Sequence, residues 1–125
     1  MHTVRSIDIE RLPELREALT LWLKDAAQEF RLEGAYLYGS FARGNPHEGS
    51  DIDLVLIGPF IGKLPYRIAS VLGTTDLPIQ PLCYKREEWQ AMLDQGNPLA
   101  IEVARTSQVL WPPDGLLARG GTGGY

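Results

Sequence analysis

The sequence predicts a small α/β or α+β domain in which a mixed sheet of about three to five strands is covered by helices. Three observations support this fold class. Apolar residues recur at helical spacing over residues 12–30, short apolar runs bounded by glycine and proline follow, and helical patterns return between and after those runs. With 125 residues, of which 44% are hydrophobic and 22% charged, the chain is long enough for one hydrophobic core and one domain.

The first predicted element is an amphipathic helix of about five turns. Its apolar positions, separated by charged and polar residues, are Leu12, Leu15, Leu19, Trp22, Leu23, Ala26 and Phe30. Pro13 is tolerated because it falls in the first turn. Gly34 is expected to end this helix.

A strand, a short helix and a second strand are expected next. Residues 35–38 are predicted to form a short strand, after which Ser40 is expected to cap one or two helical turns that reach Arg43. A polar loop at residues 44–50 leads to the strand at residues 51–57. This strand is nearly all apolar, which predicts a central position in the sheet.

The second half of the chain is predicted to contain three helices and two strands. In chain order they are a helix at 63–72, a strand at 77–84, helices at 86–94 and 99–105, and a short strand at 109–111. Pro78 and Pro81 have no N–H to donate, so their strand is expected at a sheet edge or with a bulge. The domain is expected to span residues 1–111, with a flexible tail at 112–125.

Charge and composition restrict the classes of function. A net charge of −4 and a pI near 5.1 argue against broad nucleic-acid binding, which needs a basic surface. The longest uncharged run, residues 54–62, is too short to cross a membrane, and residues 1–10 carry no signal-peptide pattern. The single cysteine, Cys83, is expected to be a small buried side chain and fits a reducing compartment. We therefore expect a cytoplasmic protein.

The most informative motif joins a Gly39-Ser40 turn to Asp51 and Asp53, ten residues further on. Aspartates at alternate positions of a strand project from one face, about 7 Å apart along the backbone, and both can reach bound divalent cations. A Gly-Ser turn followed by helix-forming residues is suited to hold phosphate. Each pair alone is common in turns and loops. Together, next to two predicted strands, they indicate phosphoryl or nucleotidyl transfer.

The motif resembles the GS-x10-D-x-D signature of the DNA polymerase β-type nucleotidyltransferase superfamily. Residues 39–44 and 50–54 resemble in particular its minimal single-domain members, which are often paired with a helical HEPN protein. The similarity runs from Leu12 to Trp111 and is specific over residues 36–57. It implies a nucleotidyltransferase-like fold with ATP or another NTP as substrate.

The resemblance also implies roles for individual residues. Asp51 and Asp53 are the expected catalytic residues and would hold Mg²⁺, with two ions possible, while Gly39 and Ser40 would contact the phosphates of the nucleotide.

Two further nucleotide-binding candidates are Arg43 and Ser50. Arg43 can form charge-assisted hydrogen bonds with phosphate, although a solvated surface arginine is an equal alternative. His47 is expected to be an exposed loop residue, with a substrate contact as the alternative.

One position departs from the family pattern. Members usually carry a third carboxylate on the next strand, where this chain has Gln80. Glutamine is neutral, cannot act as a base and is a poorer ligand for Mg²⁺. Asp76 has the same strand parity but lies about 13 Å away along a strand, so it can replace the missing group only if Pro78 and Pro81 bulge the strand. The loss of this carboxylate is therefore expected to affect activation of the acceptor more than nucleotide binding.

Three functions remain open at this stage. The first is Mg²⁺-dependent transfer of an NMP, expected to be AMP from ATP, to a hydroxyl group. The chain has no room for an acceptor domain, so the acceptor site would come from a homodimer or a partner. By resemblance, that partner is a HEPN-type toxin whose antitoxin this chain would be. The second is a catalytically weak or inactive module that neutralises or scaffolds a partner by contact. The third is modification of a small molecule, such as aminoglycoside nucleotidylation.

Overall fold

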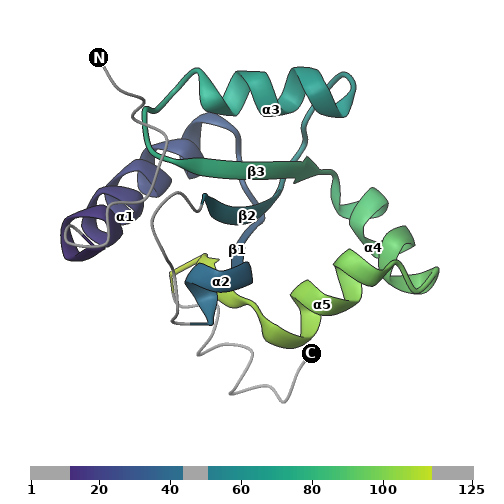
Figure 1. The fold of residues 1–125 in the computed structure, drawn as a ribbon. Helices are drawn as coiled ribbons and strands as arrows, with labels where there is room; N and C mark the ends of the chain where they lie inside the picture. The colour runs from purple at the N-terminus through teal and green to yellow at the C-terminus, as the bar shows by residue number, and fades with distance from the viewer. Residues whose placement is uncertain (1–11, 44–50, 114–125) are drawn as a thin grey trace.

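The computed structural model describes residues 12–43 and 51–113 (Figure 1). In chain order its elements are α1 (Leu12–Glu29), β1 (Gly34–Tyr38), α2 (Gly39–Ala42), β2 (Ile52–Ile57), α3 (Leu64–Leu72), β3 (Ile79–Tyr84), α4 (Arg86–Asp94), α5 (Pro98–Thr106) and β4 (Gln108–Trp111). The strands form one mixed sheet in the order β3-β2-β1-β4. Strand β1 is antiparallel to both β2 and β4, and β2 is parallel to β3. The predicted fold class is confirmed, with β2 central and β3 at an edge.

The end of α1 differs from the expectation. Arg31 has a φ of 55°, and the N–H of Leu32 donates to the carbonyl oxygen of Ala27 at 2.9 Å. This is the left-handed turn that closes many helices, here with arginine where glycine is usual. Gly34 was wrongly expected to end the helix, and it is instead the first residue of β1.

Strand β3 accommodates its prolines by position and not by bulging. Residues Ile79–Tyr84 pair with Ile52–Ile57 in an unbroken parallel register. Because β3 is an edge strand, Pro81 can lack an N–H on the side without a neighbour. Pro78 lies before the strand, where its carbonyl oxygen accepts from the N–H of Ile52 at 2.8 Å.

The two faces of the sheet are covered differently. Helices α1 and α3 pack on one face over the main core, which includes Leu23, Leu37, Leu54 and Val71. On the other face, Val55, Ile57 and Val103 are buried with partly buried residues that include Tyr36, Tyr38, Leu82, Tyr84, Trp89 and Leu99. Figure 1 shows α4 and α5 on the side where the β3 arrow ends. Asp51, Asp53 and Val55 are two residues apart from one another and therefore share this second face. Asp51 and Asp53 are only half-buried, so the face is only partly covered where β2 begins.

A buried arginine joins α3, β3 and α4 at the far end of the sheet. Arg67 is 7% exposed and forms two hydrogen bonds with the carboxylate of Glu88, at 2.7 and 3.1 Å. It also donates to the carbonyl oxygens of Gly62 and Cys83. Glu88, in the first turn of α4, also accepts a hydrogen bond from the N–H of Lys85 at 2.8 Å and so caps this helix.

The remaining expectations concern the cysteine, membrane-spanning helices and the C-terminal tail. Cys83 is buried in β3, as predicted. Within the residues described, no helix has the length and apolar character to cross a membrane. The predicted flexible tail falls, from residue 114 onward, outside the residues that the structure describes.

Candidate functional site

The Gly-Ser turn and the second aspartate of the motif meet at one end of the sheet. Tyr38, the last residue of β1, pairs directly with Asp53 of β2, and Gly39 follows at the start of α2. Gly39 has a φ of 80°, and a Cβ at this position would overlap with Oδ2 of Asp53. Only glycine fits here without strain. The turn therefore lies in direct contact with the Asp53 carboxylate.

Ser40 does not have its predicted role as a helix cap. Helix α2 begins at Gly39, with Tyr38 in the N-cap position and no side-chain hydrogen bond to the cap, and half-buried Ser40 is the second helical residue. The positive φ of Gly39 turns the chain directly from strand into helix, so the helix starts earlier than expected. Arg43 ends α2, and its N–H donates to the carbonyl oxygen of Gly39 at 3.1 Å.

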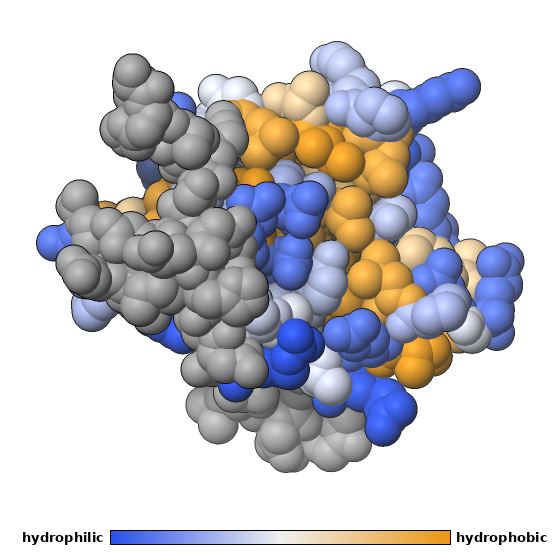
Figure 2. All heavy atoms as spheres, viewed as in Figure 1, coloured by the Kyte–Doolittle hydropathy of each residue, from blue (hydrophilic) through white to orange (hydrophobic). Residues whose placement is uncertain are grey.

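A groove of about 580 Å³ runs from the site along the exposed edge of β3. Its lining includes Tyr38, Asp51, Gln80 and Leu82. On the face seen in Figure 2, hydrophilic residues occupy a hollow near the middle, and hydrophobic residues lie above and to the right of them. The groove thus combines polar and apolar lining residues.

The structure separates the two candidates for a third acidic position. Gln80 is the register partner of Asp53 on β3, is exposed and lines the same groove as Asp51. Asp76 is exposed ahead of β3, and the unbroken register of that strand gives no bulge to bring it closer. Among the described residues, no group of three or more acidic, histidine or cysteine side chains is arranged to hold a metal.

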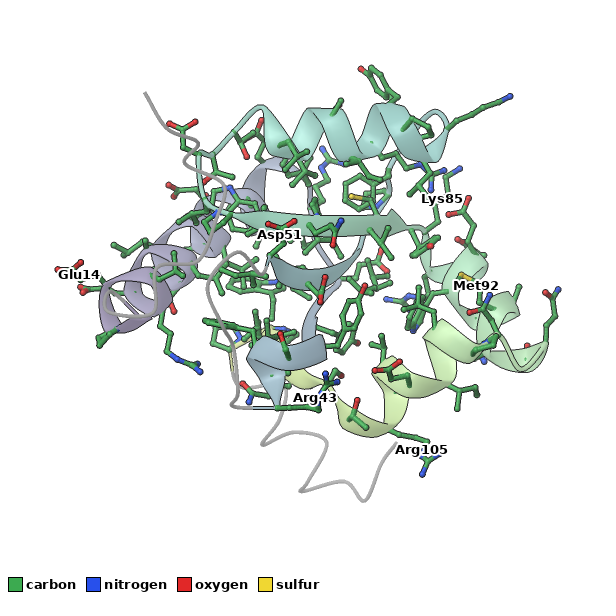
Figure 3. All side chains as sticks on the ribbon, viewed as in Figure 1. Glu14, Arg43, Asp51, Lys85, Met92 and Arg105 are labelled. Atoms are coloured by element: carbon green, nitrogen blue, oxygen red, sulfur yellow. The ribbon has the colours of Figure 1, made fainter. Side chains whose placement is uncertain are left out.

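The two aspartates repel each other and are partly removed from water. Both are half-buried, and neither forms an ion pair with another described residue. Burial raises the pKa of Asp53, the charge of Asp51 raises it further, and Arg43 opposes this effect. In Figure 3, Asp51 lies at the start of β2, whereas Arg43 lies at the end of α2 toward α5. A divalent cation between these carboxylates would neutralise them.

Two residues of the site were not found by sequence reasoning. Tyr38 is half-buried next to Asp53, and burial, followed by the charge of Asp53, raises the pKa of its phenol to about 12. Its position just before Gly39 on the same strand face as Asp53 was a usable signal. The second residue is Glu102 of α5, whose Oε2 atom lies 3.8 Å from Nη1 of Arg43. No sequence motif indicates Glu102.

Helix α5 is held in place at its start by a side-chain cap. The Oδ1 atom of Asn97 accepts from the N–H groups of Leu99 and Ala100, at 2.9 and 3.2 Å. This cap and the buried Val103 position the helix that carries Glu102. Ser50 and His47 lie outside the residues that the structure describes.

Comparison with known proteins gives the class that the motif predicted. Residues 21–72 match the family described as nucleotidyltransferase domain, and this segment contains Gly39, Ser40, Asp51 and Asp53. The resemblance that the motif predicted is confirmed over the matched segment of the chain.

Two individual proteins are similar to this chain. A "putative protein adenylyltransferase" of Methanocaldococcus jannaschii is 29% identical over 101 residues, which cover 76% of this chain and 97% of that protein. A crystal structure of a "putative nucleotidyltransferase" from Sulfolobus solfataricus has a TM-score of 0.57 and 17% identity, over 89% of each chain. The second likeness supports the nucleotidyltransferase-like fold.

The donor set fits Mg²⁺. This ion is usually bound through one or two carboxylates, substrate phosphates and water. Asp51 and Asp53 supply two half-buried carboxylates, and the missing Cβ of Gly39 leaves space beside one of them. Gln80 supplies no third charge.

Proposed function

We propose that this chain is a Mg²⁺-dependent nucleotidyltransferase that transfers AMP from ATP to a hydroxyl group of a partner protein in the cytoplasm. The observation that supports this most strongly is the contact between the Gly39 turn and Asp53, two strand positions from Asp51. The family match covers these residues. The printed name of the archaeal relative, a protein adenylyltransferase, supports AMP as the group and a protein as the acceptor.

Each residue has a defined part in this proposal. Asp51 and Asp53 hold the metal, which when bound neutralises charge on the phosphates and orients the α-phosphate. Gly39 lets the triphosphate approach the backbone, and Ser40 offers its hydroxyl and N–H. Arg43 and Ser50 add contacts to the phosphates.

The reaction is an in-line displacement at the α-phosphorus. The acceptor oxygen forms the new bond to phosphorus while the bond to the oxygen that bridges to the β-phosphate breaks. Pyrophosphate leaves, and the acceptor proton passes to solvent. Tyr38 is half-buried and pairs directly with Asp53, and in this proposal it would restrict the access of water on that side.

The proposed partner follows from the resemblance to minimal nucleotidyltransferases, whereas the proposed localisation follows from the single cysteine, which fits a reducing compartment. The proposed acceptor is a HEPN-type helical protein, with this chain as the antitoxin of the pair, and a homodimer is the other way to complete the acceptor site.

Gln80 supports a second candidate function. It lies beside Asp53, where a third carboxylate would help to activate the acceptor hydroxyl. Without that carboxylate, the chain can bind a partner and nucleotide with little or no transfer. In this alternative the protein neutralises or scaffolds its partner by contact alone.

Incubation with labelled ATP, Mg²⁺ and the product of the neighbouring reading frame separates these functions. The enzyme transfers label to the partner, Asp53→Ala abolishes the transfer, and Asp76→Asn serves as the control that retains it. Partner binding without label, unchanged in Asp53→Ala, establishes the contact module. A Gln80→Asp variant is expected to increase labelling, and no gain would refute our account of that position.

A further inference from the structure

Arg43 is shared between the proposed nucleotide site and helix α5. Its Nη1 lies 3.8 Å from Oε2 of Glu102, and the two side chains are 56% and 49% exposed. Nearby, the side chain of Gln108 donates to the carbonyl oxygen of Ala42 at 3.1 Å. The end of α2 therefore contacts both α5 and β4, and Arg43 is turned toward that side.

Arg43 is also joined to the turn beside Asp53. Its backbone N–H donates to the carbonyl oxygen of Gly39 at 3.1 Å, and a Cβ at Gly39 would overlap with Oδ2 of Asp53. Arg43 thus lies between one carboxylate that belongs to the proposed metal site and one that does not.

The pair between Arg43 and Glu102 is of the weak kind. Exposed pairs contribute little because water screens them and two long side chains must be ordered. At 3.8 Å the two groups are beyond hydrogen-bond distance. A triphosphate carries several negative charges and can accept two parallel hydrogen bonds from a guanidinium group, which makes it the stronger partner for Arg43.

We infer that Glu102 competes with the nucleotide for Arg43: it holds the arginine toward α5 in the free protein and is displaced when a triphosphate binds. This inference rests on the proposed function. Glu102 is then a positioning residue, which lowers the affinity for the nucleotide by holding Arg43. Nucleotide binding breaks the contact between Arg43 and α5.

The test is a double-mutant cycle read by calorimetric titration of the full chain with ATP in Mg²⁺. Glu102→Gln is expected to tighten ATP binding about two- to fivefold, the range of an exposed ion pair. Arg43→Gln is expected to weaken it, and Glu102→Gln should then give a clearly smaller gain. Glu87→Gln is the matched control, because it removes the same charge from an exposed residue of α4, at the far end of the sheet. Urea unfolding of each variant verifies that it is folded.

Three results would overturn the inference. If Glu102→Gln gives equal gains with and without Arg43, then Glu102 acts only as a nearby charge. If it tightens binding no more than Glu87→Gln, there is no competition. If it weakens binding, Glu102 belongs to the ligand site itself. A wild-type protein and Glu102→Gln variant that both fail to bind ATP would refute the proposed function, which is a separate outcome.

Discussion

The carboxylates at the two ends of the sheet have opposite electrostatic environments. At the far end, Glu88 is bonded to Arg67 and to the N–H of Lys85, and its pKa is lowered, chiefly by the hydrogen bond from Arg67. At the site end, Asp51 and Asp53 lie near each other without an ion pair among the described residues, and the pKa of Asp53 is raised. The first arrangement stabilises the fold. The second costs stability until a cation binds.

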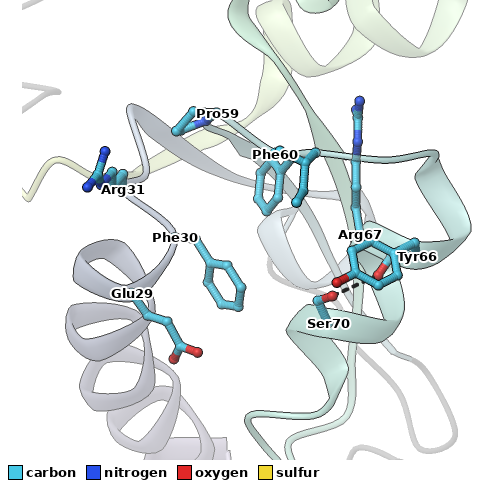
Figure 4. A pocket seen from close by; sticks show the side chains of 9 residues that line it. Glu29, Phe30, Arg31, Pro59, Phe60, Tyr66, Arg67 and Ser70 are labelled. Atoms are coloured by element: carbon cyan, nitrogen blue, oxygen red, sulfur yellow. Dashed lines mark hydrogen bonds between the residues drawn. The ribbon is translucent and has the colours of Figure 1, made fainter.

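Both ends also contain a cavity, and the difference is again in the charges. At the far end, a cavity of about 390 Å³ lies between the end of α1, the loop after β2, and α3. Figure 4 shows Phe30 and Phe60 among its lining residues, with Arg67 to the right of them. The ring centroids of the two phenylalanines are 5.9 Å apart. Its buried arginine is already neutralised by Glu88. The two ends therefore differ in that only the end with the proposed site has carboxylates without an ion pair among the described residues, which is the kind of feature that often accompanies a functional site.

The largest expected effect is the loss of stability when Arg67, at the far end of the sheet, is replaced. Arg67→Met leaves Glu88 without its cation and two carbonyl oxygens without a donor, and should lower the free energy of unfolding by about 3 kcal/mol. Urea denaturation measures this loss. A loss below about 1 kcal/mol would show that the pair is only a surface salt bridge.

Two glycines with positive φ sharpen the comparison. Gly39→Ala should cost about 2 kcal/mol or more, because backbone strain adds to the overlap with Asp53. Gly96→Ala is the matched control. Gly96 has a φ of 73° and nothing within 4 Å of an added Cβ, so it should cost only the strain, about 1 kcal/mol. Equal losses in urea denaturation would mean that Gly39 is not in contact with the carboxylate.

The smallest expected effect is on the pH dependence of stability. Glu88 and Asp53, at opposite ends of the sheet, should change the free energy of unfolding in opposite directions as pH falls. The lowered pKa of Glu88 gives stability that is present above the pKa of an unfolded glutamate and is lost as pH falls through the folded value. The raised pKa of Asp53 does the reverse, because its repulsion disappears as pH falls. Glu88→Gln should therefore flatten the acid loss of stability, and Asp53→Asn should steepen it. Urea midpoints from neutral to acidic pH test this, and shifts of the same sign would contradict it.

The sequence was sufficient for features that depend on local patterns. Helical and strand periodicity predicted the elements, and the prolines of β3 predicted an edge strand or a bulge, of which the structure has the edge strand. Local rules failed where another residue took the expected role. Arg31 adopts the left-handed turn in place of Gly34, and Gly39 starts the helix that Ser40 was expected to cap.

The long-range pairs were not predictable in this way. Arg67 and Glu88 come from different helices, as do Arg43 and Glu102. Nothing in the spacing of either pair records that the fold brings its members together. The placement of Gln80 beside Asp53 was predictable, because it depends on strand parity and a family pattern.

The central claim is that Asp51, Asp53 and the Gly39 turn together bind a metal–nucleotide complex. Calorimetric titration with ATP, in the presence and absence of Mg²⁺, tests it most directly. ATP binding should require Mg²⁺. Asp53→Asn should weaken ATP binding by about 10–100-fold, the range seen when a metal site loses a supporting group. Asp76→Asn should leave ATP binding unchanged. ATP binding that is independent of Mg²⁺, or equal in wild type and Asp53→Asn, would contradict the claim.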